Sequence, residues 1–190
     1  MDATQLGNLR LTIRNAKVST QPAEKEKAKK FMPEGRLEEI LKYATIASAL
    51  TNPSFGIPEH KLSSTVEIVA QECPKLLAIL IELELEKHLL HFLQMDILDS
   101  QLPRGLEDPR LKDLLSLKAS EFDALQWEYF PFRFRTTHYQ RTIGSEVIVP
   151  YISQQEVGKG GSSRVYKVII HPAQQRLMLQ KVKGTSHEKL

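Results

Sequence analysis

The sequence has one cysteine in 190 residues and no apolar run long enough to cross a membrane. A single thiol excludes an intramolecular disulfide, and Cys73 stands among apolar residues without a nucleophile motif, so we interpret it as a core residue. The most apolar run, residues 76–81, is followed at once by charged residues, and the N-terminus has no signal-peptide stretch. These absences favour an intracellular, cytoplasmic protein with no membrane partner.

The sequence also lacks zinc-finger spacing and an aromatic-rich RNA-binding signature, so nucleic acid is not the expected partner. Its net charge of +3 says little, but the charge is unevenly distributed. Residues 131–190 carry ten Lys and Arg against three acids, whereas the first 130 residues carry sixteen against twenty. A basic C-terminal part favours an anionic ligand such as a nucleotide, although an ordinary solvated basic face is the simpler explanation.

Apolar residues recur at helical spacing across residues 33–132, which we predict to form a helical domain. The expected helices cover residues 36–50, 63 or 64 to 72, 74–85 and 86–94, with a short one after Pro109. Ser64 and Glu67 have capping-box spacing, and Pro74 suits the first turn of a helix. The helix after Pro74 is apolar nearly all round at its start, which predicts a place at the centre of a bundle.

The segments on either side of this domain have different patterns. Residues 1–32 are expected to be weakly ordered, with a short strand conceivable where Leu9, Leu11 and Ile13 alternate with polar residues. At the other end, an aromatic cluster contains Trp127, the only tryptophan. We interpret Trp127 as a packing anchor between the bundle and the C-terminal part of the chain, in preference to a ligand-stacking residue.

From residue 133 onward the sequence is rich in β-favouring residues. We predict an extended linker over residues 133–150 and a small sheet over 151–190 that contains a glycine-rich loop. The expected fold class is therefore α+β, a mainly α-helical bundle followed by a small antiparallel β-hairpin.

One helical face combines Glu84, His88 and His91 at positions i, i+4 and i+7. Two imidazoles and a carboxylate bind zinc when a fourth group approaches. The spacing is not that of the His-Glu-x-x-His motif, however, and no cysteine is close in the sequence. A partly exposed polar face is the simpler interpretation, so we assign neither a metal site nor a catalytic triad.

The glycine-rich loop is the stronger functional signal. Residues 158–165 read Gly158-x-Gly160-x-x-Ser163-x-Val165, close to the pattern G-x-G-x-x-G-x-V. A Rossmann or P-loop motif requires a helix directly after the glycines, but strand-forming residues follow here, and the Gly-Lys-Ser/Thr ending is absent. The sequence therefore predicts a β-hairpin whose glycines let the backbone approach phosphates.

The segment 157–168 resembles the glycine-rich loop of a eukaryotic-type protein kinase. Its continuation, Val165-Tyr-Lys-Val-Ile-Ile-His-Pro172, resembles a group of kinase-like proteins from filamentous fungi. Residues 75–80, 96–103 and 122–132 around Gln126-Trp127 look like the helical region that precedes the kinase domain in that group. The resemblance covers residues 33–183 and makes residues 151–190 the first part of a kinase N-lobe.

The resemblance implies ATP as the ligand. Gly158 and Gly160 would let the hairpin fold over the triphosphate, Val157 and Val165 would cover the adenine, and Ser163 stands where a third glycine is usual. The implied nucleotide-binding residues are Val157, Gly158, Gly160, Gly161, Ser163, Val165 and Lys181.

The phosphate-pairing lysine of the kinase pattern Val-Ala-x-Lys falls within residues 177–183. If Met178 holds the alanine place, Gln180 holds the lysine place. A shift of one residue makes Lys181 the lysine, and such a shift turns the side chain to the other face of the strand. The sequence leaves this alternative open.

The 190 residues contain no His-Arg-Asp, Asp-Phe-Gly or Ala-Pro-Glu motif. Because phosphoryl transfer needs metal-bound phosphates and an aspartate near the acceptor hydroxyl, we expect this chain alone to be inactive, as a truncated kinase-like protein or pseudokinase. The alternative is a non-catalytic helical module that binds a protein partner and carries a relic of the kinase hairpin.

Overall fold

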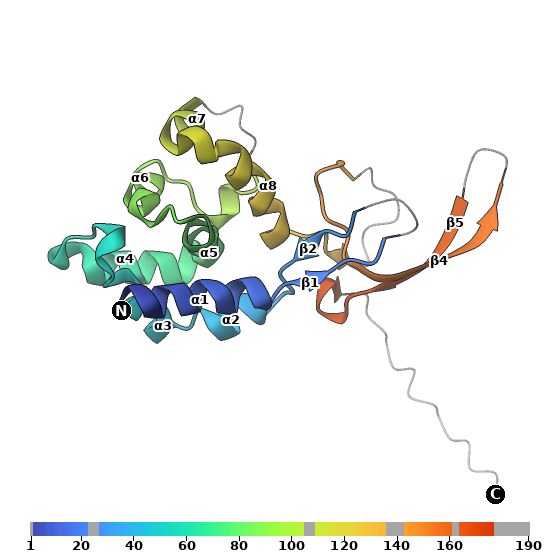
Figure 1. Cartoon of the computed structure of the whole chain (residues 1–190), viewed down its shortest axis with the longest axis horizontal. Helices are drawn as coiled ribbons and strands as arrows, with labels where there is room; N and C mark the ends of the chain where they lie inside the picture. The colour runs from blue at the N-terminus through green and yellow to red at the C-terminus, as the bar shows by residue number, and fades with distance from the viewer. Residues whose placement is uncertain (1, 23–26, 105–108, 136–142, 161–163, 177–190) are drawn as a thin grey trace, which may run out of the picture.

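The computed structural model describes residues 2–22, 27–104, 109–135, 143–160 and 164–176. Figure 1 shows a helical bundle joined to a β-rich part, with β1 and β2 between the bundle and the long ribbon of β4 and β5. The helices are α1 (Ala3–Asn15), α2 (Arg36–Ile40), α3 (Tyr43–Leu50), η1 (Pro53–Phe55), α4 (Glu59–Glu72), α5 (Pro74–Leu83), η2 (Glu86–His88), α6 (Leu89–Gln94), η3 (Asp99–Gln101), α7 (Pro109–Leu115), η4 (Ser116–Lys118), α8 (Ala119–Tyr129) and η5 (Pro172–Gln174). The strands are β1 (Val18–Ser19), β2 (Lys30–Phe31), β3 (Phe134–Arg135), β4 (Tyr151–Lys159), β5 (Arg164–Ile170) and β6 (Gln175–Arg176).

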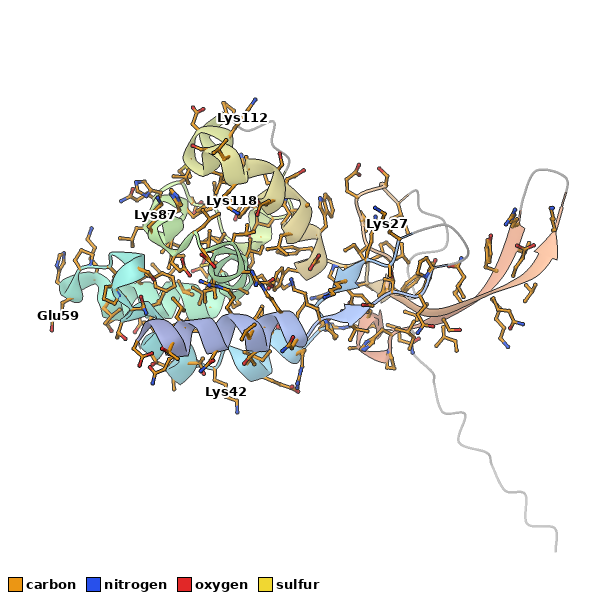
Figure 2. All side chains as sticks on the ribbon, viewed as in Figure 1. Lys27, Lys42, Glu59, Lys87, Lys112 and Lys118 are labelled. Atoms are coloured by element: carbon orange, nitrogen blue, oxygen red, sulfur yellow. The ribbon has the colours of Figure 1, made fainter. Side chains whose placement is uncertain are left out.

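The bundle is built around α5, as its sequence predicts. Pro74 occupies the first turn, and residues 76–81 are completely buried. Helices α1, α4 and α8 all pack on α5. Charged side chains such as Lys42, Glu59, Lys87 and Lys112 point away from this core (Figure 2). None of the described helices is long and apolar enough to span a bilayer.

The N-terminus of α5 is capped by a carboxylate distant in sequence. Asp99 accepts hydrogen bonds from the backbone N–H groups of Lys75 (3.0 Å) and Leu76 (2.9 Å). These N–H groups have no partner within the helix, and a carboxylate there is also favoured by the helix dipole. Asp99 therefore holds the η3 turn against the central helix.

The predicted strand at Leu9, Leu11 and Ile13 is wrong, because residues 3–15 form helix α1. Asp2 caps this helix, accepting a hydrogen bond from the backbone N–H of Gln5, whose side chain accepts one from the Asp2 N–H. Leu9 and Ile13 are buried in the core of the bundle, whereas Leu11 is exposed. Within its described residues, the segment expected to be weakly ordered thus contributes a helix and two short strands.

Two arginines attach α1 to the C-terminal end of α5. Arg10 Nε donates to the carbonyl of Ile81 (2.6 Å), and Arg14 Nη2 donates to that of Glu82 (2.6 Å). The last carbonyls of a helix have no intrahelical partner and carry the negative end of the dipole, so they favour such donors. Arg10 also pairs with Glu84 and Glu86 at the turn after α5.

Two predicted helices differ in their limits. The helix expected over 36–50 is broken into α2 and α3 by non-helical backbone at Leu41 and Lys42. The next helix begins after Pro58 instead of at the serines. Ser64 lies inside that helix and donates to the carbonyl of Lys61, so the predicted capping box does not form.

Among its described residues, the β-rich part contains three two-stranded pairings. β1 pairs with β2 and β4 with β5, both antiparallel, whereas β3 pairs with β6 in parallel. The expected linker of residues 133–150 contributes β3 and the buried Ile148, whose carbonyl accepts a hydrogen bond from the Phe132 N–H. The architecture is mixed α+β, in agreement with the predicted class.

Candidate functional site: the glycine-rich hairpin

The glycine-rich segment lies at the far end of the β4–β5 ribbon (Figure 1). Strand β5 begins at Arg164 and pairs antiparallel with β4, so a strand and not a helix follows the glycine-rich segment, and the predicted hairpin is confirmed. A Rossmann or P-loop arrangement is excluded because each places a helix N-terminus at the phosphate.

An extra residue in β4 shapes this end of the hairpin. Glu156 pairs with Tyr166, and Gly158 pairs with the next residue, Val165, so two steps on β4 correspond to one step on β5. This bulge inserts Val157, and both Val157 and Gly158 therefore oppose Val165.

The bulge creates an apolar patch beside bare backbone. The residue exposures of Val157 and Val165 are 57% and 58%. A Cβ atom added to Gly158 would lie 3.8 Å from the Val165 Cβ, an ordinary van der Waals contact. The site thus places two exposed valines next to the half-exposed Gly158, which has no side chain of its own.

The hairpin end carries cations on both strands. Lys159 and Arg164 are paired in the strand register, and Arg164 is 3.4 Å from the Glu156 carboxylate. Lys167 is exposed on β5, further from the loop. Three cations and one acid between residues 151 and 170 give this ribbon a net positive charge that suits an anionic ligand.

The structure covers four of the seven predicted site residues. Val157, Gly158 and Val165 come together as described, and Gly160 is exposed just beyond the end of β4. The positions of Gly161, Ser163 and Lys181 lie outside the described residues. So does Gln180, and the alternative between Gln180 and Lys181 remains open.

The base of the hairpin is held by N-terminal residues that the sequence did not single out. The Tyr151 carbonyl accepts a hydrogen bond from the Gln21 N–H (2.8 Å), and Phe31 packs edge-to-face on His171 with ring centroids 5.5 Å apart. Met32 joins both halves of the molecule, since its N–H donates to the Glu128 carbonyl of α8.

Glu34 adds a charged clamp at the same base. Its two carboxylate oxygens lie 3.0 Å from Arg133 before β3 and 3.0 Å from Arg176 in β6. A paired acid at this position has no local sequence signal, because its partners are about 100 and 140 residues away. Together these contacts fix the start of the ribbon relative to the bundle.

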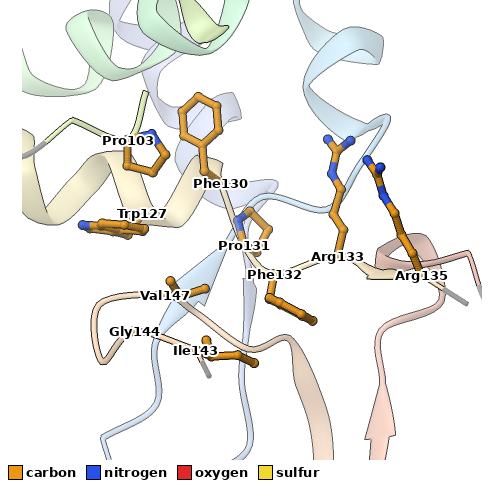
Figure 3. A pocket seen from close by; sticks show the side chains of 10 residues that line it. All are labelled: Pro103, Trp127, Phe130, Pro131, Phe132, Arg133, Arg135, Ile143, Gly144 and Val147. Atoms are coloured by element: carbon orange, nitrogen blue, oxygen red, sulfur yellow. The ribbon is translucent and has the colours of Figure 1, made fainter. Parts of the chain in front are cut away.

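Trp127 lies at the junction of the two halves, as predicted. It lines a cavity of about 440 Å³ with Pro103 from the bundle side and Val147 from the β-rich side (Figure 3). The guanidinium groups of Arg133 and Arg135 lie at the opposite end of the lining from the indole (Figure 3). The cavity is mainly aromatic and apolar where Trp127 stands, consistent with a packing role for the indole.

Two other sequence features receive structural explanations. Cys73 is completely buried, and burial raises the pKa of its thiol to about 12, so its interpretation as a core residue is confirmed.

The second feature is the face that carries Glu84, His88 and His91. The Glu84 carboxylate pairs with Arg10, and His88 and His91 have ring centroids 6.3 Å apart. Burial, Lys87 and His91 lower the pKa of His88.

Comparisons with protein-family models, with curated proteins and with solved structures find no match.

Proposed function

We propose that the β4–β5 ribbon is the glycine-rich, ATP-binding hairpin of a protein-kinase-like protein, carried by the helical bundle that precedes it. The observation that supports this most is the bulge at Val157, which sets Val157 and Gly158 opposite Val165. An adenine ring needs an apolar surface, and phosphates need peptide N–H groups that can be approached closely. The hairpin end combines both within one strand pair.

The proposed role of this chain is nucleotide binding. The His-Arg-Asp motif, which carries the catalytic aspartate, and the Asp-Phe-Gly motif, which binds metal, do not occur in its 190 residues, so we assign it no catalytic residue. Val157 and Val165 would contact the base, the backbone at Gly158 and Gly160 would face the phosphates, and Lys159 and Arg164 would raise the local positive potential.

Calorimetric titration of the full chain with Mg-ATP tests this proposal. We expect saturable binding that is at least tenfold weaker in Gly158→Ala, because the added methyl group occupies the space where backbone meets phosphate. The methyl group makes only an ordinary contact with Val165, so the variant should unfold at the same temperature as the parent. Gly7→Ala is the matched control in helix α1. Undetectable binding to the parent chain would contradict the proposal.

A second candidate function, protein binding by the helical bundle, is favoured by one observation. Leu117 in η4 is 97% exposed and follows Ser116, which has a positive φ of 47°. Leu117 lines a groove of about 620 Å³ together with leucines such as Leu83 and Leu114 and with charged residues such as Lys87 and Glu121. Exposed apolar surface next to strained backbone is typical of interaction sites. Leu117→Glu should then abolish partner binding without changing thermal stability, whereas unchanged binding would argue against this surface.

A further inference from the structure

Gln174 carries an unsatisfied acceptor at the joint between the hairpin and the bundle. Its residue exposure is 2%, and its Nε2 donates to the Met32 carbonyl at 3.4 Å. The Oε1 atom has no hydrogen-bond partner in the described part of the chain. The reverse amide orientation would set two acceptors against each other, so Oε1 is the atom that needs a donor.

A matching donor stands nearby on the central helix. Lys75 lies in the first turn of α5, and its Nζ lies 4.3 Å from the centroid of the Phe130 ring. Within the described residues this ammonium makes no hydrogen bond, although it has three N–H donors. Burial and the neighbouring Arg133 lower the pKa of Lys75, as expected for an ammonium that lacks full solvation.

Lys75 and Gln174 line the same small cavity, whose volume is about 10 Å³. A volume of this size accommodates about one water molecule and nothing larger. Glu34, Glu38 and Arg133 also contribute to the lining. A metal cation would meet two positively charged side chains there, and an anion would meet two carboxylates and an amide oxygen, whereas water can both donate and accept.

We propose that one buried water molecule occupies this cavity, accepts a hydrogen bond from Lys75 Nζ and donates one to Gln174 Oε1. The carboxylates of Glu34 and Glu38 are the acceptors available for its second hydrogen. Buried polar atoms are nearly always paired, and internal water commonly supplies the partner. This water joins the central helix of the bundle to the base of the glycine-rich hairpin. The inference is independent of whether the hairpin binds a nucleotide.

Water-to-protein NMR cross-relaxation on the isotope-labelled full chain observes this site directly. We expect the Gln174 side-chain amide protons to show a cross-peak to water with the sign of a long-lived complex. A cross-peak to a protein donor in place of water, or no long-lived water signal at this amide, would overturn the proposal.

A double-mutant cycle gives a second readout through stability. Lys75→Met and Gln174→Met each retain an unbranched side chain of similar length and remove one end of the bridge. No hydrogen bond joins the two side chains directly, so a bridging water predicts that the two effects on the unfolding equilibrium constant deviate from additivity by about fivefold or more. Additive effects would overturn the proposal. Lys75→Met combined with Lys118→Met, in an exposed pair on another face, provides the additive control.

Discussion

The ammonium of Lys17 lies 2.6 Å from the carboxylate of Glu82, and both side chains are almost completely buried, at 2% and 6% exposure. Glu82 also accepts a hydrogen bond from the Tyr129 hydroxyl, and Lys17 pairs with Glu128 at 2.7 Å. This network connects the end of α1 with α5 and α8 at one point. Removing Lys17 therefore takes away the nearest counter-charge of the buried Glu82 carboxylate.

Lys17→Met should lower the free energy of unfolding by about 3 kcal/mol, because Glu82 then keeps its buried charge with only the Tyr129 hydroxyl and the partly exposed Arg14, 3.5 Å away, as partners. Urea denaturation followed by circular dichroism measures the loss. Lys118→Met, which removes an exposed pair with Glu121, should change stability little. Adding Glu82→Met to Lys17→Met should recover much of the loss. Equal effects of the two lysine substitutions would contradict a buried network.

Stability should fall as the pH rises through 6 because of Asp99. Burial raises the pKa of this carboxyl to about 6, against the opposing effect of the Lys75 and Leu76 N–H groups. The folded state therefore holds the proton more tightly than the unfolded chain, whose pKa is near 3.8. This contribution is present below pH 4 and is lost as the pH rises past 6.

The comparison that isolates Asp99 uses the non-titrating variant Asp99→Asn. The quantity to follow is the unfolding free energy of the parent minus that of this variant. It should decrease by an amount on the order of 2 kcal/mol between pH 4 and pH 7. Asp113→Asn, at an exposed position of α7, provides the baseline. Parallel pH profiles of the parent and Asp99→Asn would show that this carboxyl does not titrate differently in the folded state.

Two glycines should respond to alanine in opposite directions. Gly7 lies inside α1 with nothing near its missing Cβ, so Gly7→Ala should stabilise the protein by about 0.5–1 kcal/mol. Gly35 has a φ of 82°, and Gly35→Ala should destabilise it by about 1 kcal/mol although space is available. Thermal unfolding of both variants checks this, and a stabilising effect at Gly35 would be the contrary result.

On the hairpin, Val165→Ala should weaken Mg-ATP binding by about tenfold at most, since it removes apolar surface from the proposed base contact. Ile169→Ala is the matched control, because Ile169 is 53% exposed on the same strand but lies further from the glycines. Calorimetric titration of both variants separates a local contact from a general effect on the ribbon. Equal loss in both would count against the assigned position of the base.

The Cys73 thiol should be inert in the folded protein. The raised pKa and complete burial of this thiol leave almost no thiolate accessible to a reagent. Ellman's reagent should react slowly at pH 8 and quickly in denaturant. A Leu117→Cys variant in a Cys73→Ala background, with its thiol at an exposed position, should react at once. Fast reaction of the native Cys73 would indicate opening of the core around α5.

The sequence was sufficient to predict elements that have strong local signals. Pro74 and the uninterrupted apolar run after it identified the buried central helix, and strand-forming residues after Gly160 predicted a hairpin. The N-terminal helix was missed because Leu9, Leu11 and Ile13 fit a period of two as well as a helix. The capping-box spacing of Asp2 and Gln5 favours the helix, and the burial of Leu9 and Ile13 with exposure of Leu11 confirms it.

The sequence by itself determined the helical core, the hairpin and the glycine-rich position of the candidate site, since each depends on residues close together in the chain. The tertiary structure alone decided what holds these parts together: Lys17 with Glu82, Asp99 at the start of α5, and Glu34 between Arg133 and Arg176. Such partners are separated by many residues and are charged, so no periodic pattern marks them. These groups pair only in the folded state. There, burial removes them from water, and each group depends on its partner for a counter-charge or a hydrogen bond.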